Sequence, residues 1–206
     1  MNININTFND WAIKDKDIGM QKGHIESVNK MFELIKDQTK IFDKPFKFLD
    51  IGCGNGWVVR KASKLKNCKL SEGVDGAIEM IKKARRKDKK NNYYFEDIEE
   101  WIPNKKYNII FSMETFYYFK KPKEILKNLY KHLHLNGVVV IGIDHYKENK
   151  PSLLWDEEYN IKTNTLSISE WKNCFINSNF KNTINYQYGK KDDWLGTLIL
   201  LGKKKT

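Results

Sequence analysis

The sequence predicts an α/β protein, a three-layer sandwich in which helices cover both faces of a mostly parallel seven-stranded sheet. From residue 46 onward, short apolar segments alternate with amphipathic helical segments across short links, as in repeated βαβ units. The segment Val138–Ile143 is apolar at nearly every position, which is typical of a central strand covered on both faces. The end of the chain breaks this alternation with two successive strand-like segments, which should pair antiparallel.

The segment before the alternating region is expected to hold one helix, at about Ile25–Lys36. Its apolar residues recur at helical spacing, namely Val28, Met31, Phe32 and Ile35. The stretch Met1–Thr7 is polar and alternating and carries no signal-peptide pattern. Residues 1–40 are therefore interpreted as an N-terminal cap segment on a single domain that spans residues 1–206.

The first half of the sheet is predicted from three short apolar segments and the helices between them. Strands are expected at Phe46–Ile51, Lys69–Val74 and Asn92–Phe95. A helix is expected over Trp57–Leu65, and a second one contains Ala77, Ile78, Ile81 and Ala84 at helical spacing.

The second half continues the same rhythm before the antiparallel end. A fourth strand is predicted at Tyr107–Ser112, and Pro122 suits the first turn of the next helix. That helix has the apolar stripe Ile125, Leu126, Leu129 and Leu133, and Asn136-Gly137 is expected to end it. After the fifth strand, Ser167 and Glu170 have capping-box spacing for a helix with Trp171, Cys174 and Phe175, and the last strands are Asn182–Tyr188 and Thr197–Leu201.

Composition excludes several classes of protein. The chain has 206 residues, of which 40% are hydrophobic and 13% aromatic, so it can build a core and is not disordered. Its longest apolar runs are far shorter than a bilayer span, and a cytoplasmic protein without a membrane partner is expected. The cysteines form no C-x-x-C pair and the histidines no H-x-x-x-H pair, so no metal site is predicted.

The charge balance is basic, at 37 − 26 = +11. A basic chain can bind nucleic acid, but only Arg60, Arg85 and Arg86 are arginine, and arginine is the residue that reads bases and phosphates best. The basic runs Lys82–Lys90 and Lys203–Lys205 should lie at the end of the sheet away from the strands' carboxyl ends. A nucleic-acid partner is therefore possible but not favoured, and the sequence makes no prediction of oligomeric state.

The glycine-rich turn after the first strand is the strongest functional signal. Gly52, Gly54 and Gly56 follow an apolar strand, and glycine lets a ligand approach the main chain closely. The spacing is G-x-G-x-G, and Trp57 stands where the dinucleotide fingerprint requires glycine. Asp50 would be poorly placed beside a pyrophosphate but well placed beside an ammonium or sulfonium group.

Carboxylates follow the next strands along the chain. Asp75 could accept hydrogen bonds from both hydroxyls of a ribose, and Asp97 could accept one from an adenine amino group while the Ile98 N–H donates to the ring. A fourth segment, Phe111–Glu114, ends the next strand. Each of these features also has a simpler structural interpretation. The glycines could form a tight turn between strand and helix, and Asp75 or Asp97 could be the N-cap of a helix. Cys53 could be a small residue packed in the core.

Together and in this order, these segments resemble class I S-adenosylmethionine-dependent methyltransferases. Leu49–Gly56 is similar to the first motif of that family, Gly73–Met80 to its acidic second motif, and Phe95–Ile98 to its third. The resemblance covers residues 46–144 well and implies the strand order 3-2-1-4-5-7-6 with the last strand antiparallel. Two turn positions depart from the pattern, Leu135–Gly137 in place of Pro-Gly-Gly and Gly76 after Asp75.

The chain looks most like the small single-domain branch related to quinone-biosynthesis methyltransferases. The segments that carry this narrower resemblance are Trp11-Ala12, Gly19–His24, Ser112–Tyr118, and Tyr146–Asn149 with Trp155. The resemblance implies transfer of a methyl group from S-adenosylmethionine to a small-molecule acceptor by direct in-line displacement. The residues that it implies for the cofactor are Asp50, Gly52, Cys53, Gly54, Asn55, Gly56, Asp75, Gly76, Asp97, Ile98 and Met113.

The acceptor pocket is expected over the carboxyl ends of the fourth and fifth strands. His145 is the candidate base, because the ordinary pKa of histidine lies near neutrality, although it could equally be a loop histidine. The other pocket candidates are Trp11, His24, Glu114, Tyr117, Tyr118, Tyr146 and Trp155. Residues 145–166 are interpreted as a lid-like insertion, because loops of this length are usually functional.

Three alternative functions remain open at this level. The chain could be a tRNA or rRNA methyltransferase, which its basic charge would suit. A nicotinamide oxidoreductase is disfavoured by Trp57 and Asp50. The chain could also be a non-catalytic partner subunit that keeps the fold.

Overall fold

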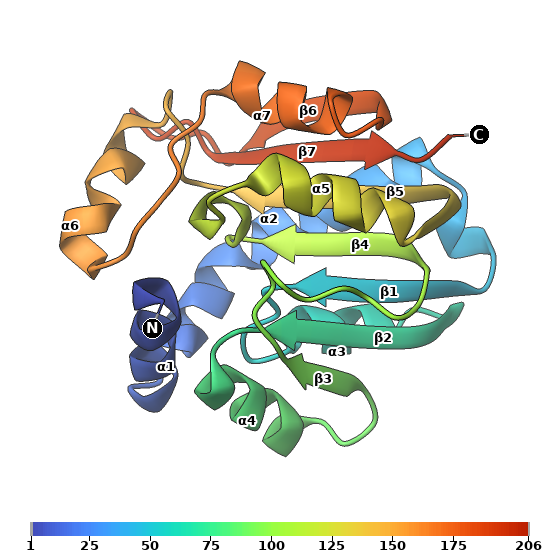
Figure 1. Ribbon diagram of the computed structural model, residues 1–206, viewed down its shortest axis with the longest axis horizontal. Helices are drawn as coiled ribbons and strands as arrows, with labels where there is room; N and C mark the ends of the chain where they lie inside the picture. Colours follow the sequence, from blue (N-terminus) through green and yellow to red (C-terminus); the bar gives the residue numbers. More distant parts are fainter. Residues whose placement is uncertain (1, 206) are drawn as a thin grey trace.

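The computed structural model describes residues 2–205 and shows one seven-stranded sheet between two layers of helices (Figure 1). The strand order β3-β2-β1-β4-β5-β7-β6 confirms the predicted order. β1 to β5 pair in parallel, and β7 pairs antiparallel with both β5 and β6, as predicted. The strands are β1 (Phe46–Ile51), β2 (Cys68–Asp75), β3 (Asn92–Phe95), β4 (Tyr107–Met113), β5 (Leu133–Ile143), β6 (Lys181–Tyr188) and β7 (Thr197–Lys203).

The helices cover both faces of this sheet or lie beside the carboxyl ends of its strands (Figure 1). They are α1 (Ile3–Ile13), α2 (Lys16–Gln38), α3 (Trp57–Ser63), α4 (Ile78–Lys87), α5 (Pro122–Lys131), α6 (Trp155–Tyr159) and α7 (Ile168–Ile176), with 3-10 turns at Ile41–Asp43, Phe116–Tyr118 and Lys150–Leu154. On one face, Met31 of α2 and Val58 of α3 pack with the strand residue Phe111. On the other, Leu126 of α5 and Trp171 of α7 share a core with Ile110. Both faces of the central strands are therefore buried.

The carboxyl ends of β1, β2 and β4 point to one edge of the molecule, where α1 and α6 also lie (Figure 1). α1 is joined there to the chain that follows α6. The Asn4 side chain accepts from the Lys162 N–H at 2.7 Å and donates to the Lys162 carbonyl at 2.9 Å, and the Thr7 hydroxyl donates to the Asn160 carbonyl at 2.9 Å. The start of the chain and residues 160–162 thus sit together beside the strand ends.

The N-terminal segment is more helical than the sequence predicts. α1 was not expected, and α2 begins at Lys16 rather than near Ile25. The Asn2 side chain accepts from the Asn4 N–H at 3.0 Å and caps α1. Ile5, Phe8 and Ala12 recur at helical spacing, but this apolar stripe is short and is interrupted by polar residues, so the sequence pattern alone does not indicate the helix. Tertiary packing against α4, through Phe8 and Ala12, supports the helix.

The boundary between α5 and β5 also differs from the prediction. α5 ends at Lys131, and Leu133 pairs with Tyr107 as the first residue of β5 instead of closing the stripe of the helix. Asn136, at φ 63°, and Gly137 lie inside the strand, where the pairing register with β4 shifts. Backbone bonds join them to Lys204, so a turn-forming pair is held in a strand by the neighbouring chain.

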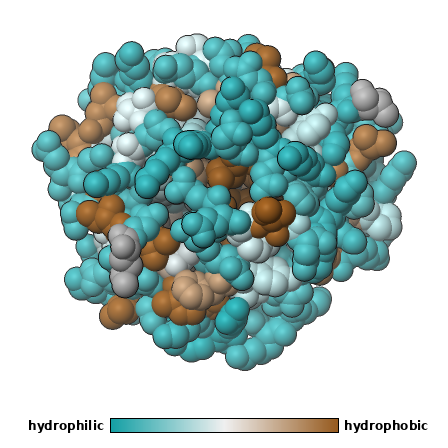
Figure 2. Space-filling view, viewed as in Figure 1, coloured by the Kyte–Doolittle hydropathy of each residue, from teal (hydrophilic) through white to brown (hydrophobic). Residues whose placement is uncertain are grey.

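The surface in the view of Figure 2 is largely hydrophilic, with apolar side chains in small separate patches. Within residues 2–205, every helix is too short or too polar to serve as a membrane-crossing segment.

Candidate functional site

A cavity opens at the carboxyl ends of β1, β2 and β4 and is bordered by α1 and α2. Nearly all of the residues predicted for the cofactor line it, although they come from separate parts of the chain. These are Asp50, Gly52, Cys53, Gly54, Asn55, Asp75, Gly76, Asp97, Ile98 and Met113. Gly56 is not part of the lining and instead precedes α3, with φ 76°.

The glycine turn needs its glycines for steric reasons. Gly52 and Gly56 have φ of 72° and 76°, which L side chains rarely adopt. A Cβ at Gly52 would collide with the side chain of Thr115, and one at Gly56 with the ring of Tyr93. The main chain is therefore packed tightly on the protein side of the turn, while its other side borders the cavity.

Two carboxyl groups stand next to this turn, of which Asp50 is buried and Asp75 is half-buried. Asp75 accepts from the Gly54 N–H at 2.8 Å and from the Ala77 N–H at 2.7 Å. Burial raises the pKa of Asp75 despite these two bonds. Burial also raises the pKa of Asp50 far above its ordinary value, and the neighbouring charge of Asp75 raises it further. A positively charged group between them would stabilise both carboxylates and reverse these shifts.

Asp97 lies at the rim of the same cavity, beyond the end of β3. One of its oxygens accepts from the Glu99 N–H at 3.0 Å, so Asp97 also holds the turn that follows it. This turn brings Ile98 to the cavity, where Tyr118 and Phe119 supply aromatic surface. Within the described chain, no helix begins directly after Asp97, so the helix-cap alternative is wrong for this residue, and its contact within the turn is compatible with a role in ligand binding.

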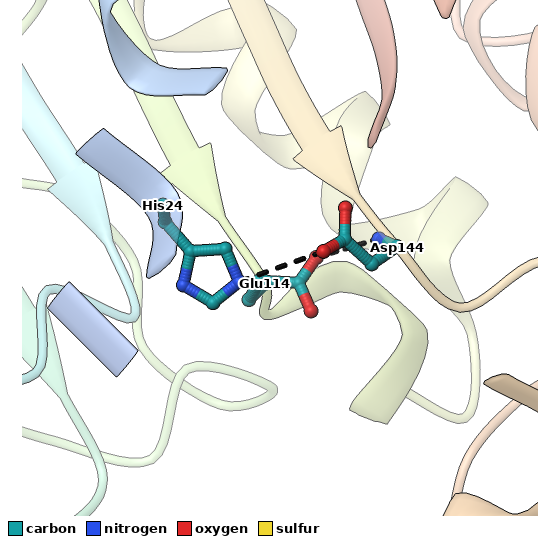
Figure 3. Close-up of side chains that lie close together, drawn as sticks. All are labelled: His24, Glu114 and Asp144. Carbon is teal, nitrogen blue, oxygen red and sulfur yellow. Dashed lines mark hydrogen bonds and ion pairs between the residues drawn. The ribbon is translucent and has the colours of Figure 1, made fainter. Parts of the chain in front are cut away.

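A second cluster of polar groups lies at the ends of β4 and β5 (Figure 3). The Nε2 atom of His24, on α2, lies 3.5 Å from an Asp144 carboxylate oxygen. Glu114 accepts from the Asp144 backbone N–H at 2.6 Å and from the Tyr117 hydroxyl at 2.7 Å. His24 and Glu114 line the cavity, so this cluster borders the space left beside the predicted cofactor residues.

The three side chains of this cluster influence one another's protonation. Burial lowers the pKa of His24, but the bond to Asp144 and the charge of Glu114 outweigh it and raise the pKa to about 9. Burial and the charge of Asp144 raise the pKa of Glu114 to about 8. The two acidic neighbours of His24 therefore favour its protonated form.

The structure separates the predicted acceptor residues into two groups. His24, Glu114 and Tyr118 line the cavity, whereas Trp11, Tyr117, Tyr146 and Trp155 lie outside its lining. Trp11 packs edge-on against Phe8 and Tyr159, and Trp155 packs against Tyr117. The Tyr146 hydroxyl donates to the Gly196 carbonyl at 2.9 Å inside the core. These aromatic residues surround the site and hold the segments that border it.

His145 lies away from the cavity, in contrast to the expectation that it serves as a base. Its Nδ1 atom is 3.0 Å from the Ser152 carbonyl and its Nε2 atom is 2.7 Å from the Thr165 hydroxyl. Burial lowers its pKa. Both ring nitrogens therefore hold residues 145–166 together. The histidine that lines the cavity is His24.

The sequence interpretation missed the residues that α1 and the start of α2 contribute. Ile5 and Phe8 of α1, and Asp17, Met20 and Gln21 of α2, line the cavity. The Asn55 side chain donates to Asp17 at 2.8 Å, which ties α2 to the glycine turn. The helical spacing of Ile5, Phe8 and Ala12 is the signal that could have indicated them.

Comparison with known proteins identifies the family. Residues 23–184 match the family model described as a methyltransferase domain. The chain belongs to this methyltransferase family. The match confirms the predicted resemblance, and it includes the strands that carry the glycine turn, Asp75 and Glu114.

This methyltransferase domain has several curated relatives that carry O-methyltransferase names, and another that is named as a tRNA U34 carboxymethyltransferase of Helicobacter pylori. It is 33% identical over 125 residues to a malonyl-[acyl-carrier protein] O-methyltransferase of Bacillus cereus, which covers 58% of this chain and 46% of the relative. It is 28% identical over 136 residues to a ubiquinone biosynthesis O-methyltransferase of Rickettsia typhi, which covers 64% and 54%. The chain thus spans about half the length of these relatives.

Among solved structures, the methyltransferase domain resembles a chain of the complex between the Haloferax volcanii Trm112 methyltransferase activator and a methyltransferase. The TM-score is 0.81 at 21% identity, and the match covers 97% of this chain and 98% of the other. At this identity the likeness shows the fold alone.

Proposed function

We propose that this methyltransferase domain binds S-adenosylmethionine in the cavity and transfers its methyl group to a small-molecule acceptor. One observation carries the proposal: Asp50, Asp75 and Asp97, from three separate strand ends, converge with the glycine turn on a single cavity. The curated relatives named as O-methyltransferases support the same reaction class.

The chemistry of the lining suits each part of this cofactor. Asp75 offers carboxylate oxygens for the ribose hydroxyls, and Asp97 with the Ile98 N–H offers an acceptor and a donor for adenine. Asp50 and Asp75 together favour a cationic ligand, because burial raises the pKa of both carboxyl groups and the charge of Asp75 raises that of Asp50 further. The cofactor supplies a methyl group activated on a sulfonium.

The protein's part is to position the acceptor and exclude water. An acceptor held between Tyr118 and Glu114 would lie beside Met113 and the glycine turn, all of which line the same cavity. Holding the acceptor's nucleophilic atom in line with the S–CH₃ bond makes the methyl transfer effectively unimolecular, and this lowers the entropic part of its barrier. Enclosure by α1 and α2 keeps competing water away.

The composition of the lining favours a small molecule over RNA. Within residues 2–205, the lining contains no lysine or arginine, although the chain has 37 of these residues. Phosphate groups would need such cations. The lining is instead acidic, with aromatic and apolar side chains, which suits a compact organic ligand.

Cofactor binding is tested by calorimetric titration of the protein with S-adenosylmethionine and S-adenosylhomocysteine. We expect binding by the unaltered protein and an affinity at least roughly 10-fold lower in Asp75→Asn, because hydrogen bonds to a charged group contribute about 1.5–3 kcal/mol. The exposed Asp37→Asn should bind normally and serves as the matched control. Absence of binding, or equal affinities in all three proteins, would contradict the proposal.

The acceptor class is tested by incubating a metabolite extract with labelled S-adenosylmethionine and separating small molecules from macromolecules. We expect enzyme-dependent label in the small-molecule fraction. Label confined to RNA or protein would show that the acceptor class is wrong while leaving the cofactor site intact.

A further inference from the structure

We infer that His24, Glu114 and Asp144 form a binding site for a divalent transition-metal ion at the acceptor side of the cavity. The three residues are far apart in the sequence, and none of them belongs to a recognisable metal motif. The fold brings them together: β4 and β5 are parallel neighbours that end at Met113 and Ile143, and α2 crosses beside them.

The donor atoms are close enough for one ion. One ligand atom from each residue lies within 4.8 Å of the others, so small side-chain rotations would bring all three to coordination distance. The set is one imidazole nitrogen and two carboxylates (Figure 3). Two carboxylates offset the charge of a divalent ion, and the mixed nitrogen and oxygen donors suit Mn²⁺ or Zn²⁺ better than Mg²⁺, which prefers oxygen ligands.

An independent observation concerns the same Asp144 carboxylate. Asp144 is only 7% exposed, and its Oδ1 atom is buried without a hydrogen-bond partner within the described part of the chain, while Oδ2 faces His24. A buried carboxylate oxygen without a donor is costly and requires a compensating partner. Rotation of this carboxylate would turn Oδ1 toward a cation bound by the cluster, and the cation would then supply that partner.

The residues around the cluster orient the ligands as metal-site neighbours do. The Tyr117 hydroxyl and the Asp144 N–H fix the two oxygens of Glu114. Glu114 has φ 57°, a conformation that non-glycine residues seldom adopt and that concentrates at functional sites.

The ion would have coordination positions left for an acceptor. His24 and Glu114 line the cavity, so water or the acceptor's oxygen or nitrogen could complete the shell from that side. A metal ion lowers the pKa of a bound hydroxyl and so favours its nucleophilic form. This role in methyl transfer rests on the proposed function, whereas the metal site itself does not.

The site is tested by removing metals from the protein with a chelator and titrating it with MnCl₂, ZnCl₂ and MgCl₂ by calorimetry. We expect one Mn²⁺ or Zn²⁺ per chain and much weaker Mg²⁺ binding. Asp144→Asn and His24→Gln should each bind Mn²⁺ at least roughly 10-fold more weakly, whereas His134→Gln, at the opposite end of β5, should bind it normally. Electron paramagnetic resonance of bound Mn²⁺ should show nitrogen coupling that disappears in His24→Gln.

Circular dichroism of both variants, together with titration of Asp144→Asn with S-adenosylhomocysteine, separates a lost metal site from a lost fold. Asp144 lies outside the cavity lining, so its folded variant should keep the cofactor affinity of the unaltered protein. Absence of stoichiometric Mn²⁺ and Zn²⁺ binding to the unaltered protein, or full binding by folded Asp144→Asn, would overturn the metal site. Metal binding without S-adenosylhomocysteine binding would overturn the proposed function and leave the metal site standing.

Discussion

At the scale of single residues, the glycine turn shows how sterics set a ligand site. Gly52 and Gly54 both have positive φ, at 72° and 50°. They differ in their surroundings, because a Cβ at Gly52 would collide with Thr115, whereas the nearest atom to a Cβ at Gly54 is the Met80 sulfur, 4.0 Å away. The two glycines therefore meet the same backbone requirement under different packing.

This difference predicts unequal costs for alanine at the two positions. Gly54→Ala should lower the free energy of unfolding by about 1–2 kcal/mol through backbone strain alone. Gly52→Ala adds overpacking against Thr115, which typically costs about 1–3 kcal/mol more. Urea denaturation of both variants measures the difference, and equal destabilisation would show that Thr115 moves aside freely.

At the scale of elements, Glu72 joins three strands and a loop. Its carboxylate, on β2, is fully buried. It accepts a hydrogen bond from the Asn92 side chain of β3 at 2.9 Å. Three further donors lie at 2.7 Å, namely Tyr94 of β3, Tyr107 of β4 and Lys105. Burial alone would raise the pKa of Glu72, but these four donors outweigh it and lower the pKa. The buried charge therefore stabilises the packing of β2 and β3, the strands that are followed by Asp75 and Asp97.

The lowered pKa predicts how stability depends on pH. The contribution of Glu72 should be complete above the unfolded-state pKa of about 4.3 and should be lost as the pH falls through the lower folded-state value. Glu72→Gln should cost about 1–3 kcal/mol at pH 7, and its difference from the unaltered protein should shrink in acid. Urea unfolding at several pH values checks this, with the exposed Glu33→Gln as control. A difference that stays constant down to pH 3 would contradict it.

At the scale of the whole molecule, basic charge and the cavity are separated. The chain carries a formal charge of +11, yet within residues 2–205 the only basic side chain in the cavity lining is His24. Lysines at the end of β7 lie beside the start of β5, at the opposite end of the sheet. The β7 lysines therefore attract polyanions to a surface remote from the proposed site. Lys83 of α4 lies closer to the cavity than the sequence predicts, because it pairs with the lining residue Asp17.

This separation predicts that RNA binds without occupying the cavity. Fluorescently labelled RNA should bind weakly, with an affinity that falls steeply as salt is raised. Saturating S-adenosylhomocysteine should leave RNA binding unchanged, and excess RNA should leave S-adenosylhomocysteine binding unchanged. Mutual competition in an anisotropy assay would instead indicate that RNA enters the cavity.

The sheet and the cofactor side of the site could be predicted, because both depend on local patterns. Apolar strands followed by Gly52 and Asp75 fix a parallel topology and place these residues at one edge of the sheet. The acceptor side depends on long-range packing. His24 reaches Asp144 only because α2 crosses β5, and nothing in the spacing of histidines indicates that contact. His145 lies two residues after the end of β5, but its ring contacts Ser152 and Thr165 of its own segment rather than the cavity.

The opposite direction of β7 has a practical consequence for handling this protein. Lys203 pairs with Val138, so the chain leaves the sheet on the side remote from the cavity, whereas Asn2 contributes to the cavity lining. An affinity tag, fluorophore or surface linker attached at the carboxyl terminus should leave the entrance unobstructed. The same attachment at the amino terminus would stand beside the opening and would compete with whatever enters it.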